Sequence, residues 1–220
     1  MEKIVVICAH PDDEVLGLGG TLKMHKKKGN KIFVIVVATG QFGRDDSKRG
    51  ILKRKNQCKE CGSILGIDKI EFLDYPDQTL DIVKVSELSS KIQKFLVKWN
   101  PSTVYTHFFG DLNQDHRRVF EATSIAVRPS KKINVRNLIC FETPSTTEYK
   151  FNFAEFSPNY FVDIEKSLDE KIEAIKQYKN EIQAAPYPRS ISAIKNRASY
   201  WGSQIGKKYA EAFMIIRKIE

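Results

Sequence analysis

Short apolar runs alternate with longer amphipathic stretches along most of the chain. Residues 3–9 (KIVVICA) and 31–38 (KIFVIVVA) are apolar at nearly every position, which is typical of strands buried on both faces of a sheet. Three further apolar runs of strand length follow at residues 69–73, 103–107 and 137–142. In the stretches between these runs, apolar residues recur at the spacing of helices. The predicted helices cover residues 16–28, 47–65, 84–99 and 115–127.

Glycines mark the ends of two of these helices. Gly29 and Asn30 follow the first helix, and Gly66 stands where a C-terminal cap is expected after the second. The regular alternation of buried strands with helices predicts an α/β protein with a mostly parallel sheet. We therefore expect a single doubly wound α/β domain over residues 1–220, with helices covering both faces of the sheet.

The last third of the chain has a less regular pattern. Residues 143–158 are polar and rich in turn formers, which predicts a loop. Residues 160–164 have the pattern of a last strand, and residues 164–182 have helical spacing. The remaining segment begins with AAPYPRS and has no clear period, and we expect it to wrap around the core.

The composition is that of a globular protein, with 41% hydrophobic and 29% charged residues. No apolar run is long enough to cross a membrane, and the first residues lack the apolar core of a secretion signal. The net charge of +9 comes without a recognisable nucleic-acid module, so we expect no nucleic-acid partner. His25 lies among lysines on a predicted helix, where a solvated side chain is expected.

The four cysteines favour a reducing compartment. Cys8 and Cys140 lie in apolar strand runs, where a thiol packs as a small hydrophobic group. Cys58 and Cys61 form a C-x-x-C within a Lys-rich helix, without the second ligand pair of a structural zinc site. A cytoplasmic protein with free thiols is the simplest interpretation.

Polar side chains follow the first buried strand abruptly, in the stretch AHPDDE at residues 9–14. In open parallel sheets, ligands bind beyond the carboxyl ends of the strands. Pro11 fixes its own φ and lacks an N–H, so the strand is expected to turn there. In a tight turn, His10 and Asp13 can converge and offer two ligands to a divalent metal.

A third metal ligand is expected from THFFGDLNQDHRR, residues 106–118, directly after another predicted strand. Its histidine, His116, opens the following helix. Three protein ligands leave a coordination position open for water and substrate, as in catalytic zinc sites. Asp12 adjoins a ligand but must point elsewhere, which suits a general base. The pattern therefore predicts metal-assisted hydrolysis.

These two motifs resemble those of the PIG-L/LmbE-like family of N-acetylglucosaminyl deacetylases. The resemblance rests on H-P-D-D-E after the first strand and D-x-N-x-D-H at residues 111–116. It extends to the helix around Arg54, to EFLDYPDQTL at residues 71–80 and to YAEAF at residues 209–213. It thus covers most of the chain.

The resemblance implies a Rossmann-like α/β fold and a zinc enzyme that removes acetyl from an amino sugar. By position, His10, Asp13 and His116 match the zinc ligands, and Asp12 matches the general base. Some better-known members have a histidine that helps the tetrahedral intermediate where this chain has Asn113. This departure leaves Asp12 and His107 as two candidates for the acid that protonates the leaving amine.

Other polar residues have both functional and ordinary interpretations. Asp115 is a candidate to orient an imidazole or to cap the helix that starts there. Arg54, by its family position, is expected to contact substrate hydroxyls or a phosphate. Asp111 and Asn113 are site candidates that also suit a loop. The remaining candidates for the substrate-binding wall follow strands or lie in loops: Thr39, Gly40, Gln41, Tyr75, Asp77 and Tyr149.

The predicted activity is removal of the N-acetyl group from an amino sugar or sugar conjugate, by attack of metal-bound water with Asp12 as general base. The expected cofactor is Zn²⁺, with another divalent metal as an alternative. The substrate is a small molecule, free or nucleotide- or lipid-linked, and the basic composition is compatible with an anionic one. A catalytically impaired sugar- or nucleotide-sugar-binding protein of the same fold is the alternative function. A homo-oligomer is compatible with the sequence.

Overall fold

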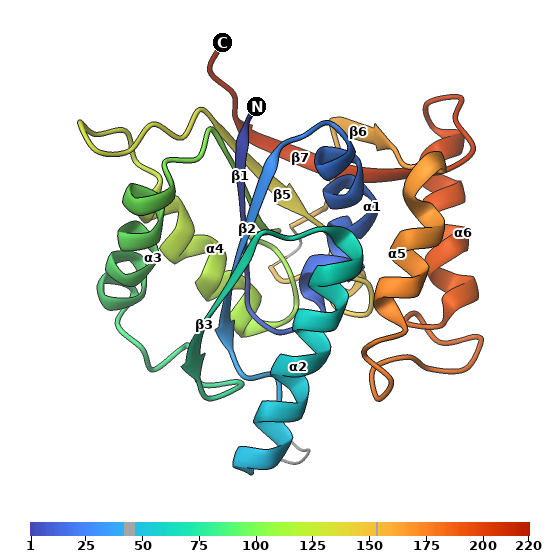
Figure 1. Cartoon of the computed structure of the whole chain (residues 1–220), viewed down its shortest axis with the longest axis horizontal. Helices are drawn as coiled ribbons and strands as arrows, with labels where there is room; N and C mark the ends of the chain where they lie inside the picture. The colour runs from blue at the N-terminus through green and yellow to red at the C-terminus, as the bar shows by residue number, and fades with distance from the viewer. Residues whose placement is uncertain (42–46, 153) are drawn as a thin grey trace.

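The strands form one seven-stranded sheet in the order β3-β2-β1-β4-β5-β7-β6 (Figure 1). The computed structural model describes residues 1–41, 47–152 and 154–220. The strands are β1 (Lys3–Cys8), β2 (Lys31–Ala38), β3 (Lys69–Tyr75), β4 (Thr103–His107), β5 (Asn137–Phe141), β6 (Tyr160–Asp163) and β7 (Ala210–Arg217). The α-helices are α1 (Asp13–Lys27), α2 (Lys48–Leu65), α3 (Val85–Trp99), α4 (Gln114–Ala126), α5 (Leu168–Ile175) and α6 (Ile191–Ser203). Short 3-10 helices are η1 (Thr147–Tyr149) and η2 (Glu165–Ser167).

The sheet is mostly parallel, as the sequence predicted. Strands β1 to β5 pair in parallel, whereas β7 runs antiparallel between β5 and β6. The expectation that the C-terminal segment wraps around the core is therefore incomplete, because its last strand is inserted into the sheet itself. The alternation of polar and apolar residues in β7 is weak, and its antiparallel pairing has no local sequence signal.

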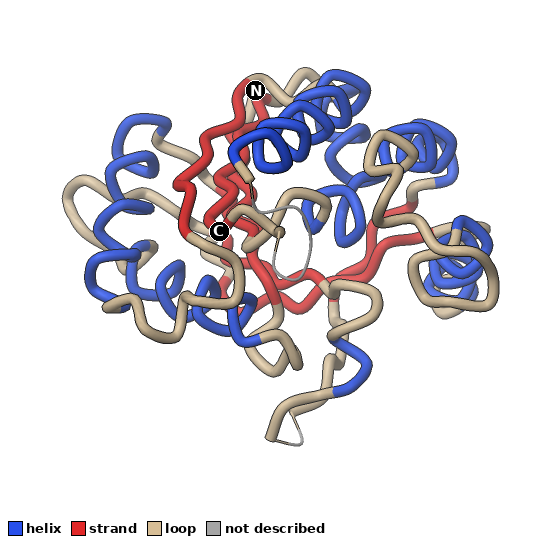
Figure 2. Tube along the Cα trace, turned by 90° about the horizontal axis from the view of Figure 1, so that it is seen from below, coloured by secondary structure: helices blue, strands red, loops and turns tan. Residues whose placement is uncertain are grey.

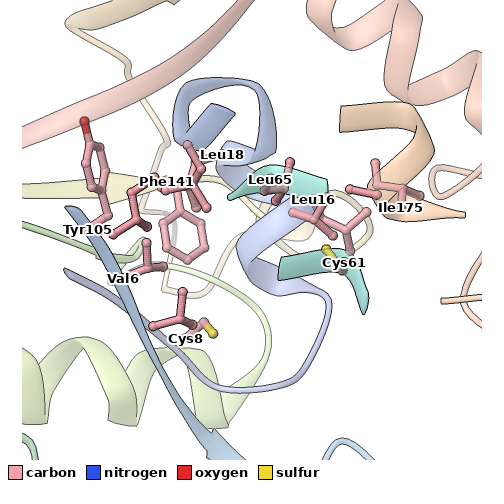
Figure 3. Packing of buried hydrophobic residues seen from close by; sticks show 14 of the residues in the cluster. Val6, Cys8, Leu16, Leu18, Cys61, Leu65, Tyr105, Phe141 and Ile175 are labelled. Atoms are coloured by element: carbon pink, nitrogen blue, oxygen red, sulfur yellow. The ribbon is translucent and has the colours of Figure 1, made fainter. Parts of the chain in front are cut away.

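Helices cover both faces of the sheet and bury two hydrophobic cores. Helices α1, α2, α5 and α6 lie on one face, and α3 and α4 lie on the other (Figure 1). Successive residues of a strand point to opposite faces, so that Ile4, Val6 and Cys8 of β1 join the first core while Val5 and Ile7 join the second. Figure 3 shows the first core, in which α1 and α2 side chains meet residues of the sheet.

The chain moves outward from β1 to β3 and then returns to β4 on the other side of β1. The carboxyl ends of β1 and β4 therefore lie side by side at the point where the strand order reverses, where α/β sheets bind their ligands. These ends point to the bottom of Figure 1, so that Figure 2 looks onto this edge of the sheet.

Helix ends agree with the sequence signals in the first half of the chain. Ser47 caps α2 by accepting a hydrogen bond from the Gly50 N–H, and Gly66 ends it with φ of 82°, in the left-handed region. The predicted helix over residues 164–182 is wrong in its length, because α5 ends at Ile175. Beyond that point the chain turns, and the Tyr178 hydroxyl donates a hydrogen bond to the buried carboxylate of Glu14.

Helix α1 bends at Leu18, whose backbone is not helical (φ −147°, ψ 22°). The buried carboxylate of Glu211 in β7 accepts hydrogen bonds from the Gly20 N–H at 2.9 Å and the Thr21 N–H at 2.7 Å. Lys171 of α5 donates to the same carboxylate at 2.6 Å and to the Leu16 carbonyl at 2.9 Å. The last strand thus caps the second half of the first helix, which explains the glutamate within YAEAF.

The expectation that His25 is solvated is wrong. Its side chain is 9% exposed and contacts the Tyr105 hydroxyl at 3.3 Å and the Asn30 amide at 3.2 Å. Burial and the nearby Lys28 lower the pKa of His25 to about 4, so the imidazole is neutral in the folded protein at neutral pH. The neighbouring lysines in the sequence point elsewhere on the helix and concealed this inward position.

Candidate metal centre

The chain turns sharply after β1 and brings His10 and Asp13 together. The Asp13 carboxylate accepts a hydrogen bond from the His10 N–H at 2.7 Å, and His10 Nδ1 lies 3.6 Å from Asp13 Oδ2. The turn depends on Asp12, which has φ of 119°. An L-residue with this φ is strained. The Asp12 N–H donates to Glu14 Oε2 at 2.9 Å, which holds the turn in place.

The first turn of α4 supplies His116 to the same point. Asn113 caps this helix, with its side-chain oxygen accepting from the Asp115 N–H at 2.9 Å. His116 Nε2 lies 3.6 Å from Asp13 Oδ1, and the rings of His10 and His116 are 5.3 Å apart between centroids. His10, Asp13 and His116 each offer a ligand atom, and these atoms all lie within 4.8 Å of one another.

Carboxylates hold the outer nitrogens of both imidazoles. His10 Nε2 lies 2.9 Å from Asp77 Oδ1 and 3.2 Å from Asp115 Oδ2. His116 Nδ1 lies 3.1 Å from Asp111 Oδ1. Such contacts fix the ring orientation and raise the basicity of the nitrogen that faces a metal. The nitrogens left facing Asp13 are Nδ1 of His10 and Nε2 of His116.

The residues present fit a divalent cation. Asp13 is fully buried, and its Oδ1 has no hydrogen-bond partner among the described residues. Burial alone would raise the pKa of Asp13, but His116, His107 and His10 lower it well below its usual value, so it is a carboxylate. A buried, ionised oxygen that faces two imidazoles is the donor set of a cation site.

Asp115 connects the metal centre to the loop after β3. Its two oxygens accept hydrogen bonds from the Gln78 N–H at 2.8 Å and the Leu80 N–H at 3.2 Å. The N-cap of α4 is Asn113, so the capping role considered for Asp115 is not the one it has. His10, Asp77 and Asp115 also form a second group of possible metal ligands beside the first. Their mutual contacts account for that arrangement without an ion.

His107 lies beneath the cluster and does not line the opening. Its Nε2 accepts a hydrogen bond from the Ala9 N–H at 2.9 Å, and its ring stacks on His116 with 3.9 Å between centroids. Burial and His116 lower the pKa of His107 to about 4. The His107 Nδ1 also lies 3.3 Å from the Thr143 hydroxyl, and its Nε2 lies 3.3 Å from Asp13 Oδ2. His107 therefore contacts the end of β1 and two of the three candidate ligands.

A cavity of about 260 Å³ opens above the cluster. It is lined by His10, Asp12, Gly40, Arg54, Asp77, Gln78, Asn113, Glu181 and Arg189. Gly40 has φ of 67°, and a Cβ at this position would lie 3.0 Å from Pro11, so only glycine fits here without strain.

Thr39, Asp111 and Tyr149 are not among the residues that line the cavity. Thr39 donates its N–H to the Tyr75 carbonyl at 3.0 Å. Asp111 is fully buried and accepts from the Thr146 hydroxyl at 3.0 Å, so it ties the loop after β5 to His116. Tyr149 is 64% exposed.

Two arginines converge on Asp12, the residue expected to act as base. Arg54 Nη2 donates to Asp12 Oδ2 at 2.9 Å, and Arg189 Nη1 donates to the same oxygen at 3.0 Å. Glu181 contacts both guanidinium groups, at 2.9 Å from Arg54 and 3.2 Å from Arg189. Sequence reasoning found Arg54 but missed Arg189 and Glu181. Arg189 lies in a segment without a clear period, and Glu181 lies in a turn at the end of the stretch that was predicted to be helical.

Glu14 supports this arrangement from below. It is fully buried, and besides the Asp12 N–H it receives a hydrogen bond from the Tyr178 hydroxyl. Burial is the main cause that raises the pKa of Glu14 to about 7. Cys58 and Cys61, in α2, are free and fully buried, as are Cys8 and Cys140.

A doubly wound sheet with a His-Asp-His cluster at its switch point defines an α/β protein of the LmbE-like type. The match to a family model then assigns the chain. It belongs to the PIG-L family, whose model, described as GlcNAc-PI de-N-acetylase, matches residues 5–127.

Relatives of known name agree with this assignment. The chain is 27% identical to diacetylchitobiose deacetylase of Thermococcus kodakarensis, over 98% of this chain and 84% of that protein. It is 30% identical to the uncharacterized deacetylase YaiS of Escherichia coli, over 80% of this chain and 90% of that protein. The conserved protein TT1542 from Thermus thermophilus has the same fold, with a TM-score of 0.83 and 25% identity, over 100% of this chain and 97% of that one.

No helix in the described part of the chain combines the length and the hydropathy that a bilayer crossing needs.

Proposed function

We propose that this protein is a metal-dependent hydrolase that removes the acetyl group from an N-acetylated amino sugar or sugar conjugate. The observation that carries the proposal is the cluster of His10, Asp13 and His116 next to a cavity that His10 and Asp12 line. Membership of a family described as a de-N-acetylase supports the reaction type.

The three ligands suit zinc, with an open position for the reaction. Two imidazoles and one carboxylate are a ligand set found in catalytic zinc sites. A divalent cation in such a site polarises the amide carbonyl and lowers the pKa of water. Every other requirement of the reaction falls to side chains of the chain itself.

Asp12 takes the proton from water. Its Oδ2 is held by Arg54 and Arg189, which fixes the carboxylate and leaves Oδ1 as the oxygen to accept a proton. General-base catalysis of this kind contributes about 10²- to 10⁴-fold in rate. The strained backbone at Asp12 separates its side chain from that of Asp13, so that adjacent carboxylates have different roles.

Asn113 stabilises the oxyanion that forms when water adds to the carbonyl. Its side-chain oxygen caps α4, which leaves its NH₂ group as a donor at the cavity wall. Positioned donors of this type act where charge develops in the transition state. The amide group cannot supply a proton, so the leaving amine needs another acid.

Asp12 returns the proton to the amine as the C–N bond breaks, giving acetate and the free amino sugar. His107 has a different role in this scheme, because it is fully buried and stacks on His116. It positions the ligand ring. Arg54 and Arg189 line the cavity on the side where sugar hydroxyls can reach them.

The test is acetate release from N-acetyl sugars by the zinc-loaded protein. We expect Asp12→Asn to lower kcat by about 10²-fold or more while zinc content is unchanged. Asp169→Asn, which changes an exposed aspartate in α5, is the matched control and keeps full activity. Retained activity in Asp12→Asn excludes this base, and absence of release by the wild type from every sugar supports a binding protein instead.

A second variant separates the two roles for His107. A leaving-group acid would move a limb of the pH–rate profile when changed to Gln. A positioning residue lowers zinc affinity and leaves the pH limbs in place. We expect the second result for His107→Gln, measured by zinc titration and by kcat across pH.

A further inference from the structure

The cavity holds two arginines whose charges are already matched. Arg54 comes from α2, and Arg189 comes from the segment before α6. Their guanidinium groups share Asp12 Oδ2 on one side and the two oxygens of Glu181 on the other. Glu181 is 6% exposed and Arg54 is 3% exposed, so these contacts lie largely out of water.

The remaining donors of these arginines are also mostly in use. Arg54 Nη2 donates to the Pro11 carbonyl at 2.6 Å, and Arg189 Nε donates to the Ser145 hydroxyl at 2.8 Å. Arg54 Nε is buried and has no hydrogen-bond partner among the described residues. A Cβ at the wall residue Gly40 would lie 3.8 Å from this nitrogen. A single N–H donor suits a hydroxyl or carbonyl oxygen, whereas bidentate binding of a phosphate needs two free N–H donors on one guanidinium group.

The charge in the cavity differs from the charge of the whole chain. Among the described residues that line the cavity, three carry carboxylates: Asp12, Asp77 and Glu181. Two carry guanidinium groups, Arg54 and Arg189. Asp13, Asp111 and Asp115 add three more acids behind the wall. The net negative charge of these acids and arginines together is therefore larger than the positive charge that one divalent cation supplies. The net charge of +9 belongs to the chain as a whole, whereas the charge of this site is negative.

An anionic group next to the reacting amide would have to displace Glu181 from both arginines or lie against it. Displacement leaves the Glu181 carboxylate buried without its partners, and an anion lying against Glu181 places two negative charges side by side in a site largely out of water. Both arrangements are strongly unfavourable. Sugar hydroxyls can instead donate to Glu181 and accept from Arg54 without breaking the cluster.

We infer that Glu181 is a specificity-determining residue that selects uncharged N-acetyl sugars and excludes those with a phosphate or carboxylate beside the acetamido group. This inference rests on the proposed deacetylase function. It narrows the substrate class and opposes the anionic option that the composition allows.

The experiment compares kcat/KM for N,N′-diacetylchitobiose and N-acetylglucosamine 1-phosphate in the wild type and in Glu181→Gln. In the wild type, kcat/KM for the neutral substrate should exceed kcat/KM for the phosphate by about tenfold or more. The reason is that repulsion between like charges a few Å apart in a partly buried site is large enough to give this ratio. Glu181→Gln should shift the ratio towards the phosphate by about tenfold or more. Glu173→Gln, an equal charge change at an exposed position of α5, should leave the ratio unchanged.

A binding measurement keeps the inference independent of turnover. Sulfate binding is measured by calorimetry for the zinc-loaded wild type and for Glu181→Gln. Tighter binding of sulfate to the variant supports the inference, and equal binding overturns it. A wild type that favours the phosphate sugar also overturns it. Turnover of neither sugar, together with the expected difference in sulfate binding, counts against the deacetylase function and leaves the role of Glu181 in place.

Discussion

The buried pair of Glu211 and Lys171 offers a sharp test of what holds α1 in place. Replacing Glu211 by Gln removes the charge opposite the Lys171 ammonium, whose distance to the carboxylate is 2.6 Å. The variant keeps one amide oxygen, which can accept a hydrogen bond from the Gly20 N–H or from the Thr21 N–H. The carboxylate, by contrast, has one oxygen for each of these donors. The perturbation therefore affects one ion pair and one helix cap.

The size of the effect follows from these contacts. Breaking a buried ion pair by removing one partner costs about 3–5 kcal/mol, because the other charge stays buried and unmatched. For a chain of this size, a loss of that order lowers Tm by about 10 °C. Removing both charges, in Glu211→Gln with Lys171→Met, should recover a large part of the loss, since no buried charge then lacks a partner.

Urea unfolding followed by circular dichroism measures the free energy of unfolding of the two single variants, the double variant and the wild type. The cycle isolates the coupling between the two side chains. A single variant that loses less than about 1 kcal/mol would place Glu211 in the range of an exposed pair and contradict the burial argument. A double variant no more stable than Glu211→Gln would show that the backbone caps, not the ion pair, dominate.

Three further outcomes are expected. The folded-state pKa of His25, about 4 against 6.5, means that its contribution to stability is complete above pH 6.5 and is lost as pH falls through 4. The loss amounts to about 3 kcal/mol. A plot of the free energy of unfolding against pH should therefore be flatter for His25→Gln than for the wild type over this range, and parallel curves would contradict the reasoning. Asp115→Ala should weaken zinc affinity by about 10- to 100-fold, because the His10 ring loses one of the two carboxylates that orient it, and unchanged affinity in a zinc titration would exclude this support. Gly17→Ala places a Cβ against the Phe141 ring, closer than van der Waals contact allows. It should cost about 1–3 kcal/mol in urea unfolding, and a neutral result would mean that the ring moves aside freely.

The sequence predicted the elements that depend on local pattern. Strands β1 to β5 and helices α1 to α4 agree with the predicted ranges to within a few residues, because continuous apolar strands and helical spacing are local signals. The expectation that His10, Asp13 and His116 lie together also came from a local rule, since carboxyl ends of parallel strands share one edge of the sheet.

What the sequence could not predict depends on contacts between distant segments. Arg189 reaches the cavity from a segment without a periodic pattern, and Glu181 reaches it from a turn in a stretch whose spacing predicted a helix. The roles of both residues depend on the distant Asp12 and Arg54. The helix predicted to residue 182 ends early because Tyr178 is bonded to Glu14, 164 positions away in the chain. Part of the segment between β2 and α2 lies outside the described residues, which omit 42–46.

The position of β7 within the sheet determines when the sheet can be completed during synthesis of the chain. This strand leaves the ribosome after the other six, yet it must enter between β5 and β6. Until it arrives, the backbone N–H and C=O groups along one side of β5 have no strand partner, and β6 has nothing to pair with. An uncovered strand edge of this kind recruits other chains. A growing chain is therefore most prone to aggregate in the interval between the emergence of β5 and that of its last strand.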